Sequence, residues 1–264
     1  MRYDRKMTKK ARTLLFAACL TLFALAAPII IGYSQGYRFD FATKRIVQTG
    51  GIYVKAMPRN VNVYINGKFK KTTSIFTNSC LMENLIPKTY NVEVKKQGYH
   101  TWQKNLTVWE TQVTEAKNIL LIPENPNFTI LTSDEQEIID ITSQIDYSTT
   151  SSDKKKVIEA DDHEIWISFV KTQNNQEESL GESEDKIFLN RFSEKIDKVC
   201  WLNNYYLIFN IGDEIKIAEI DDRNKINMVD LLQFPSPEIF WDEENSKLYV
   251  LSEDNLYVSA NLLP

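Results

Sequence analysis

The stretch NVEVKKQGYHTWQK, residues 91–104, indicates how residues 33–123 fold. Val92 and Val94 alternate with polar residues, which is the period of a β-strand with one buried face. Gly98 stands in a polar segment that is typical of a turn, because glycine reaches backbone conformations that other residues avoid. Trp102 then starts a returning strand, where its large apolar surface makes it the expected packing anchor.

The same two-residue period runs through the residues around this stretch, from 33 to 123. Asn66-Gly67 separates two alternating runs, and both residues tolerate the positive φ of a tight hairpin turn. No segment here keeps a helical period for three turns, so we expect a small antiparallel β-sandwich. The residues expected on its buried faces are Ile52, Val54, Ala56, Val61, Val63, Ile65, Tyr90, Val92, Val94, Leu106, Val108 and Ile119–Ile122.

Two strings in this region, YVKAMPRNVNVYINGK and LIPKTYNVEVKKQGYHTWQKNLTV, resemble the PEGA domain, a β-sandwich module of bacterial and archaeal surface proteins. The resemblance covers about residues 36–123 and implies a non-catalytic domain outside the cytoplasm, in a membrane-anchored surface protein of bacteria. One turn departs from the family pattern, because Pro87-Lys88-Thr89-Tyr90 lacks the usual glycine. The matching positions are Pro58, Val63, Ile65, Gly67, Leu85, Pro87, Tyr90, Val92, Val94, Gly98, Tyr99 and Trp102.

The N-terminal segment predicts the location of the protein. Residues 1–12 carry six Lys or Arg and one Asp, and Thr13 to Ile31 follow without a charge. Nineteen helical residues span about 28 Å, close to the roughly 30 Å core of a bilayer. We therefore expect a cytoplasmic basic tail at 1–12, a transmembrane helix at 13–32 and the bulk of the chain outside the cell membrane. A cleaved signal peptide with its site near Ala27, or a lipoprotein acylated at Cys19, are the alternatives.

The two halves of the region after residue 32 differ in charge, and each contains one cysteine. Residues 33–123 hold 13 basic and 5 acidic residues, whereas residues 124–264 hold 12 basic and 30 acidic residues. Such asymmetry indicates surfaces that face different partners. The two cysteines in this part, Cys80 and Cys200, are too few for a disulfide scaffold. Free thiols are the favoured interpretation, and a single bond between the two stays open.

The acidic half, residues 124–264, contains three similar segments. Each has a short apolar strand, an acidic turn and a second strand, which starts at Ile165, Ile215 or Leu256. Trp201 and Trp241 precede the last two, and Tyr147 takes that place in the first. A period of about 40–45 residues is typical of propeller blades, and the segments resemble TolB-type or WD-type blades. We therefore expect a partial or shortened propeller of about three blades, with a polar loop at residues 171–185, completed by the sandwich or by a partner.

The sequence contains no motif for a catalytic, metal or cofactor site. It lacks Gly-x-Ser-x-Gly, His-Glu-x-x-His, a Cys-x-x-Cys pair and a phosphate-binding glycine loop, so no cofactor is expected. His163 lies in Glu-Ala-Asp-Asp-His-Glu, which is typical of a hairpin turn. His100 has no acidic or cysteine neighbour, and we interpret it as a strand residue packed by aromatic side chains.

Five lysines form the candidate binding surface: Lys68, Lys70, Lys71, Lys95 and Lys96. Solvated hairpin ends are the favoured explanation of these lysines, and an anionic partner such as the membrane surface, a cell-wall glycan polymer or an envelope protein is the functional interpretation. Nucleic acid is not expected, because no basic groove with interleaved aromatic residues is present. Unpaired blade edges offer a route to self-association.

These observations predict a membrane-anchored, non-catalytic binding or scaffolding protein of the cell envelope. A sensor or regulatory ectodomain is the first alternative, although a cytoplasmic tail of about twelve residues leaves no room for an output domain. An envelope hydrolase is the second, and its acidic residues would be Asp161, Asp162, Asp221 and Asp222.

Overall fold

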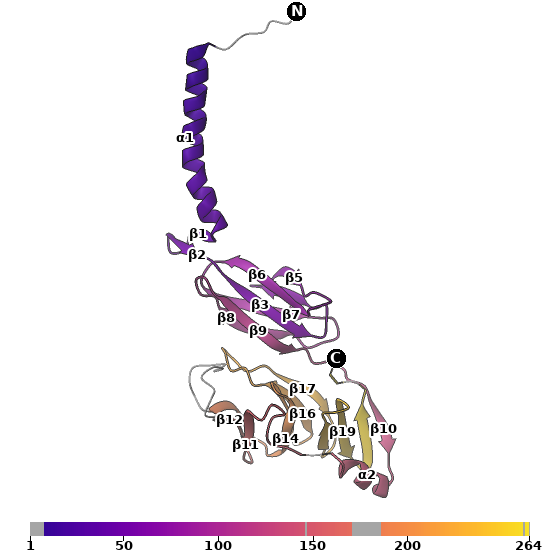
Figure 1. Cartoon of the computed structure of the whole chain (residues 1–264). Coiled ribbons are helices and arrows are strands. Elements are labelled where there is room, and N and C mark those ends of the chain that lie inside the picture. The colour runs from indigo at the N-terminus through magenta and orange to yellow at the C-terminus, as the bar shows by residue number, and fades with distance from the viewer. Residues whose placement is uncertain (1–7, 146, 171–185, 261, 264) are drawn as a thin grey trace, which may run out of the picture. The chain divides into compact units, whose positions relative to one another are not determined.

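The computed structural model describes residues 8–145, 147–170, 186–260 and 262–263. Within these residues the protein is mainly β, with two helices and several separate sheets, none of which closes into a barrel (Figure 1). The chain forms two compact units. One takes in the residues up to Tyr53 with Leu81–Thr89 and Thr107–Glu115, and the other takes in Val54–Cys80, Tyr90–Leu106 and everything from Ala116. The predicted polar loop at 171–185 lies outside the described residues.

Helix α1, Lys9–Ser34, contains the predicted apolar segment 13–32 and extends beyond both of its ends. Thr8 caps its N-terminus by accepting a hydrogen bond from the Ala11 amide, at 3.3 Å. None of its residues is buried, and its best window has a mean hydropathy of 2.6. Among the described helices, α1 is the one long and apolar enough to cross a membrane.

A small hairpin follows α1 directly, with β1 at Tyr37–Asp40 and β2 at Arg45–Gln48. Their register pairs Tyr37 with Gln48 and Phe39 with Ile46. The hairpin forms its own two-stranded sheet, separate from the sandwich strands.

The next seven strands form the two sheets expected of the sandwich. One sheet has the order β6-β3-β9 and the other β5-β4-β7-β8. Every residue predicted for the buried faces is at most 8% exposed, so the period-two pattern is confirmed. Asn66 and Gly67 both have positive φ between β4 and β5, which confirms the tight hairpin. The strands are β3 Gly50–Met57, β4 Asn62–Ile65, β5 Lys68–Thr72, β6 Ser79–Leu85, β7 Thr89–Lys95, β8 Trp102–Thr107 and β9 Val113–Leu120.

The acidic half forms three successive antiparallel sheets, ordered β11-β12-β13, β14-β15-β16-β17 and β10-β20-β19-β18. The predicted second strands at Ile165, Ile215 and Leu256 are confirmed, because each lies one residue after the start of β12, β16 or β20. The strands are β10 Phe128–Thr132, β11 Lys156–Ala160, β12 Glu164–Phe169, β13 Lys186–Arg191, β14 Ile196–Asn203, β15 Tyr206–Ile211, β16 Glu214–Glu219, β17 Met228–Gln233, β18 Glu238–Asp242, β19 Lys247–Ser252 and β20 Asn255–Ser259.

Three details of the repeat prediction need correction. Tyr147 lies outside the strands, whereas Trp201 lies in β14 and Trp241 in β18, and the first described sheet has three strands where each of the other two has four. The third sheet gains its fourth strand from β10, which pairs antiparallel with β20. The sequence analysis also missed helix α2, Glu135–Thr142, whose N-cap Asp134 accepts a hydrogen bond from the Glu137 amide at 3.0 Å.

The middle sheet is buried on both faces. Trp201 of β14 belongs to a core shared with the first sheet, and Trp241 of β18 belongs to a core shared between the second and third sheets. All six residues of β15 are buried, as expected for a strand covered on both sides. The sandwich residues Leu120 and Ile122 extend into the second of these cores.

Candidate binding cleft

The structure places four of the five predicted lysines on one sheet of the sandwich and Lys96 directly after its strand β7, in different settings. Lys68, Lys70 and Lys71 lie on β5, an edge strand whose residues are all exposed. Lys95 pairs with Glu93 and lies 5.1 Å from the centre of the Tyr64 ring. Lys96 donates a hydrogen bond to the Arg59 carbonyl at 2.8 Å. The β5 lysines therefore form the more accessible part of this surface.

The acidic and histidine candidates have structural partners. Asp161 accepts hydrogen bonds from the His163 and Glu164 amides, both at 2.7 Å, which confirms the turn. These bonds lower the pKa of Asp161. Asp222 is exposed, and Asp162 is paired with Lys195 at 3.1 Å.

Asp221 and His100 lie close to a contact between the sandwich and the middle sheet. The Asp221 carboxylate receives two hydrogen bonds from the Arg223 guanidinium, at 2.9 and 2.7 Å. Burial works against the carboxylate, but Arg223 and Lys104 together lower its pKa. His100 lines a small cavity of about 20 Å³ beside Trp102, and its Nε2 is buried without a hydrogen-bond partner in the part of the chain that the structure describes.

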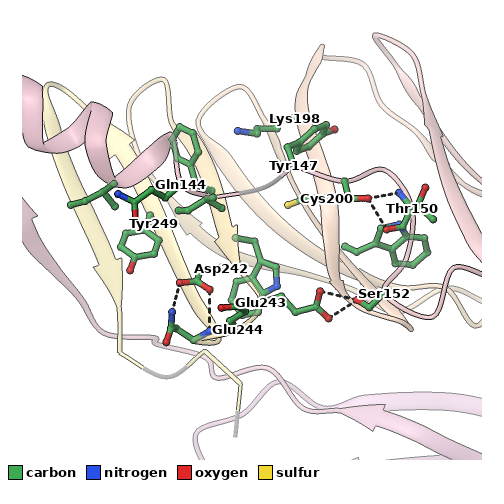
Figure 2. Close-up of a pocket in the computed structure, with 17 residues that line it drawn as sticks. Gln144, Tyr147, Thr150, Ser152, Lys198, Cys200, Asp242, Glu243, Glu244 and Tyr249 are labelled. Carbon is green, nitrogen blue, oxygen red and sulfur yellow. Dashed lines mark hydrogen bonds between the residues drawn. The ribbon is translucent and has the colours of Figure 1, made fainter.

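A larger cleft, of about 610 Å³, opens in the acidic half. Its walls come from the segment after α2, from β14 of the middle sheet and from β18 and β19 of the third sheet (Figure 2). Aromatic rings, carboxylates and small polar side chains share its surface. The residues are Ile141, Gln144, Ile145, Tyr147, Ser148, Thr150, Ser152, Lys198, Cys200, Trp201, Phe240, Trp241, Asp242, Glu243, Glu244, Asn245 and Tyr249.

Lys198 and Cys200 project into this cleft from β14 at alternate positions of the strand. The Lys198 ammonium lies 3.9 Å from the centre of the Phe240 ring and 5.5 Å from that of Tyr147. Burial lowers the pKa of Lys198, against the opposing effect of Glu238. Burial also raises the pKa of the Cys200 thiol to about 12. The thiol therefore stays protonated at neutral pH and is a poor nucleophile.

The acidic wall of the cleft is held in place by hydrogen bonds. Both Glu243 carboxylate oxygens accept from the Ser152 hydroxyl, at 2.5 and 2.7 Å. Asp242 accepts from the Asn245 backbone amide at 3.0 Å and from its side-chain amide at 2.7 Å. Figure 2 shows Glu243 bonded to Ser152 and Asp242 bonded on its other side.

Trp241 differs from the corresponding residue Trp201. The Trp201 indole donates to the Thr149 carbonyl at 2.8 Å. Trp241 is 6% exposed, and its indole nitrogen is buried without a partner in the described structure. A buried donor without an acceptor costs about 1–3 kcal/mol, so this N–H is a group that a bound acceptor would satisfy.

Sequence reasoning did not find this cleft. It identified Tyr147, Trp201 and Trp241 as repeat positions, but Lys198 and Glu243 had no distinctive spacing that pointed to a site. Among the described residues, no group of three His, Cys, Asp or Glu side chains is arranged to hold a metal ion.

Comparison with known proteins supports the resemblance of the sandwich region to the PEGA domain. The PEGA domain family model matches residues 49–120, so this segment contains a PEGA domain. No curated protein matches the chain. A solved structure from Bacteroides uniformis ATCC 8492, a candidate carbohydrate binding protein, is 12% identical, with a TM-score of 0.22 over 69% of this chain and 99% of its own. Likeness at that level carries no argument about function.

Proposed function

We propose that this protein is a membrane-anchored, non-catalytic binding protein whose PEGA domain and repeat sheets stand outside the cytoplasm. The PEGA domain at residues 49–120 and the apolar helix α1 support this location. The cleft supports binding, because it combines a cavity of about 610 Å³ with a buried, unpartnered indole donor. Pockets of roughly 300–1,000 Å³ with a few oriented polar groups are typical of small-ligand sites.

The chemistry of the cleft indicates its ligand class. Asp242, Glu243 and Glu244 outnumber the single cation Lys198, so the site disfavours an anionic polymer. Tyr147 and Tyr249 offer rings with hydroxyl groups, and serine, threonine and asparagine side chains offer further donors and acceptors. We therefore propose a neutral or amine-bearing polyhydroxylated ligand, such as a glycan segment of the envelope. The Trp241 N–H would donate to one of its oxygens.

The repeat sheets are proposed to be three blades of a shortened propeller. In support, β14 and β18 each open a sheet, carry a tryptophan and pack against the preceding sheet. β10 adds to the last sheet beside β20, so the two ends of the region are joined within one sheet. On this proposal the cleft lies where the opening strands of neighbouring blades meet.

A glycan-binding titration tests the ligand assignment. The full chain in lipid nanodiscs is titrated with a neutral N-acetylglucosamine oligomer, its deacetylated amino form and polyglutamate, with binding followed by tryptophan fluorescence and ligand-observed NMR. One of the first two is expected to bind, and Glu243→Gln and Tyr249→Ala to weaken it at least tenfold. Lys70→Ala, on the exposed β5, is the matched control and should change nothing.

The opposite pattern overturns the assignment. Binding of polyglutamate alone, lost in Lys70→Ala and kept in Glu243→Gln, would move the site to the β5 lysines. The absence of binding to any of the three would reject a glycan cleft. N-terminal sequencing of the mature protein tests the anchor separately, because a start near Ala27 means that α1 is removed as a signal peptide.

A further inference from the structure

The hairpin β1–β2 exposes an apolar face immediately after α1. Tyr37 and Phe39 point to the same side of β1, and Ile46 lies opposite Phe39 in the register. Their exposures are 42%, 47% and 71%, and Phe41 in the turn is 84% exposed. The Phe39 and Phe41 rings meet edge to face at 5.1 Å. Exposing four large apolar side chains of one small hairpin to water is unfavourable, and such a patch is typical of an interaction surface.

The hairpin is attached to the end of α1 by side-chain and backbone bonds. Arg38 donates to the Tyr33 carbonyl at 2.7 Å, and its guanidinium lies 3.5 Å from the centre of the Tyr33 ring. This carbonyl at the C-terminus of the helix also accepts from the Gly36 amide at 3.2 Å, and a cation is favoured at that end of a helix. The Thr49 amide donates to the Gly36 carbonyl at 2.9 Å. The helix therefore continues into the hairpin through a fixed junction.

Chain geometry places this hairpin at the membrane surface if α1 spans the bilayer. Thr13 to Tyr33 is an uncharged helical segment of about 31 Å, close to the roughly 30 Å hydrocarbon core. Two residues lie between Ser34 and Tyr37, so β1 starts three residue steps, at most about 10 Å, from the helix end. The headgroup region extends about 5–7 Å beyond the core on each side.

We propose that the apolar face of β1–β2, made of Tyr37, Phe39, Phe41 and Ile46, inserts into the outer leaflet of the membrane that α1 spans. This inference rests on the proposed membrane anchor. Aromatic side chains are favoured at the boundary between headgroups and acyl chains. The exposed Lys44 and Arg45 lie next to this face in the sequence, where they can reach lipid phosphates. The hairpin thus fixes the orientation of the PEGA domain's first strand relative to the bilayer.

The Arg38 side chain extends this fixation to the PEGA domain. Its second terminal nitrogen donates to the Asn84 side-chain carbonyl on β6, at 2.9 Å. A single guanidinium therefore contacts the end of α1, the hairpin and a PEGA strand. With the hairpin inserted in lipid, this fixed junction also sets the orientation of the contacted PEGA strand relative to the bilayer.

Site-directed spin labelling of the full chain tests the insertion. Nitroxides are placed at Leu22→Cys, Phe41→Cys and Phe76→Cys in a background where Cys19 and Cys80 are alanine. Cys200 is buried and its thiol stays protonated, so it does not label. In nanodiscs of phosphatidylethanolamine and phosphatidylglycerol, the label at 41 is expected to collide more with oxygen than with a water-soluble nickel complex. The label at 76, a loop position 94% exposed, is expected to show the reverse.

The three positions separate failure of this inference from failure of the anchor. A label in lipid at 22 with a label in water at 41 overturns the hairpin insertion and leaves the anchor standing. A label in water at 22 overturns the anchor and the insertion with it. In a further outcome, the labels at 41 and 76 collide equally with the nickel complex in nanodiscs. If the label at 41 then becomes shielded from the nickel complex only after two copies are cross-linked, the apolar face serves self-association instead of insertion.

Discussion

Two regions of the molecule combine a tryptophan, a lysine and carboxylates, with opposite results. Where the sandwich meets the middle sheet, Trp102 donates to Glu219 at 2.7 Å and Lys104 pairs with the other Glu219 oxygen at 2.5 Å. Asn227 donates to that same oxygen at 2.7 Å. In the cleft, the Trp241 indole nitrogen has no partner among the described residues, and the Lys198 ammonium lies 3.9 Å from the centre of the Phe240 ring.

The difference between the two regions lies in how completely the polar groups are paired. Lys104 is 0% exposed and also donates to the Asp221 carbonyl at 2.5 Å, so the first cluster is dry and closed. Such a network fixes the contact between two parts of the chain, because breaking it leaves a buried charge. The cleft keeps an open volume and an unused hydrogen-bond donor, two features that a ligand-binding site needs. The same residue types thus stabilise the structure in the closed cluster and are available for ligand binding in the cleft.

Removing the cation from the closed cluster should have the largest effect. Lys104→Met leaves the Glu219 carboxylate buried with its hydrogen-bond donors but without a counter-charge. We expect a loss of about 3–5 kcal/mol in the free energy of unfolding. Urea unfolding of the full chain in detergent micelles, followed by tryptophan fluorescence, measures it.

A second substitution checks the physical cause. Lys104→Met combined with Glu219→Gln removes both charges and keeps an acceptor for Trp102, so it should recover more than half of the loss. A double variant as unstable as the single one would show that packing, and not the unpaired charge, dominates. Lys70→Met on the exposed β5 should leave the unfolding curve unchanged.

The sequence allowed the sandwich to be predicted well because one period governs it. Alternation identified the buried faces, and the same rule carried a signal that was not used: Trp102, Lys104 and Leu106 share one face of β8. A lysine on a buried face requires a carboxylate nearby. Its partner Glu219 is more than a hundred residues away, and no local pattern in a single sequence identifies such a pair.

The cleft could not be predicted for a related reason. It is formed where a non-repeating segment after α2 replaces the opening strand of the first sheet. The repeat pattern placed Tyr147 as the counterpart of Trp201 and Trp241, because spacing alone cannot show which copy of a repeat has lost its regular structure. Helix α2 was missed because only eight residues of helix follow Asp134, too few for a clear period.

The two tryptophans provide a matched pair of substitutions with a smaller effect. Trp102→Phe removes a donor to a buried carboxylate, a bond worth about 1.5–3 kcal/mol. Trp241→Phe removes an N–H that has no partner, so only the lost ring volume counts. We therefore expect Trp102→Phe to lower the free energy of unfolding by at least about 1.5 kcal/mol more than Trp241→Phe, measured by circular dichroism in urea. Equal losses would mean that the Trp241 indole already has an acceptor, such as a bound water.

The smallest expected effect is a pH dependence caused by Glu219. Burial raises the pKa of Glu219 above its ordinary value, against the opposing effects of Lys104 and Trp102. The folded protein therefore holds this proton to higher pH than the unfolded chain does. Its stabilising contribution is complete below the unfolded pKa and is lost as pH rises through the folded one. Asp221, whose pKa is lowered, acts in the opposite direction and at lower pH, so the two contributions do not coincide.

Glu219→Gln isolates this contribution. As pH rises above the ordinary Glu pKa of about 4.5, the free energy of unfolding of the unsubstituted chain should fall relative to that of the variant, by at most about 1.4 kcal/mol per pH unit. The comparison uses the difference between the two slopes, because the other carboxylates contribute equally to both. Parallel slopes would mean that the Lys104 ammonium fully offsets the burial of Glu219. In that case the attraction between Lys104 and Glu219 would equal the free-energy cost of burying the Glu219 carboxylate.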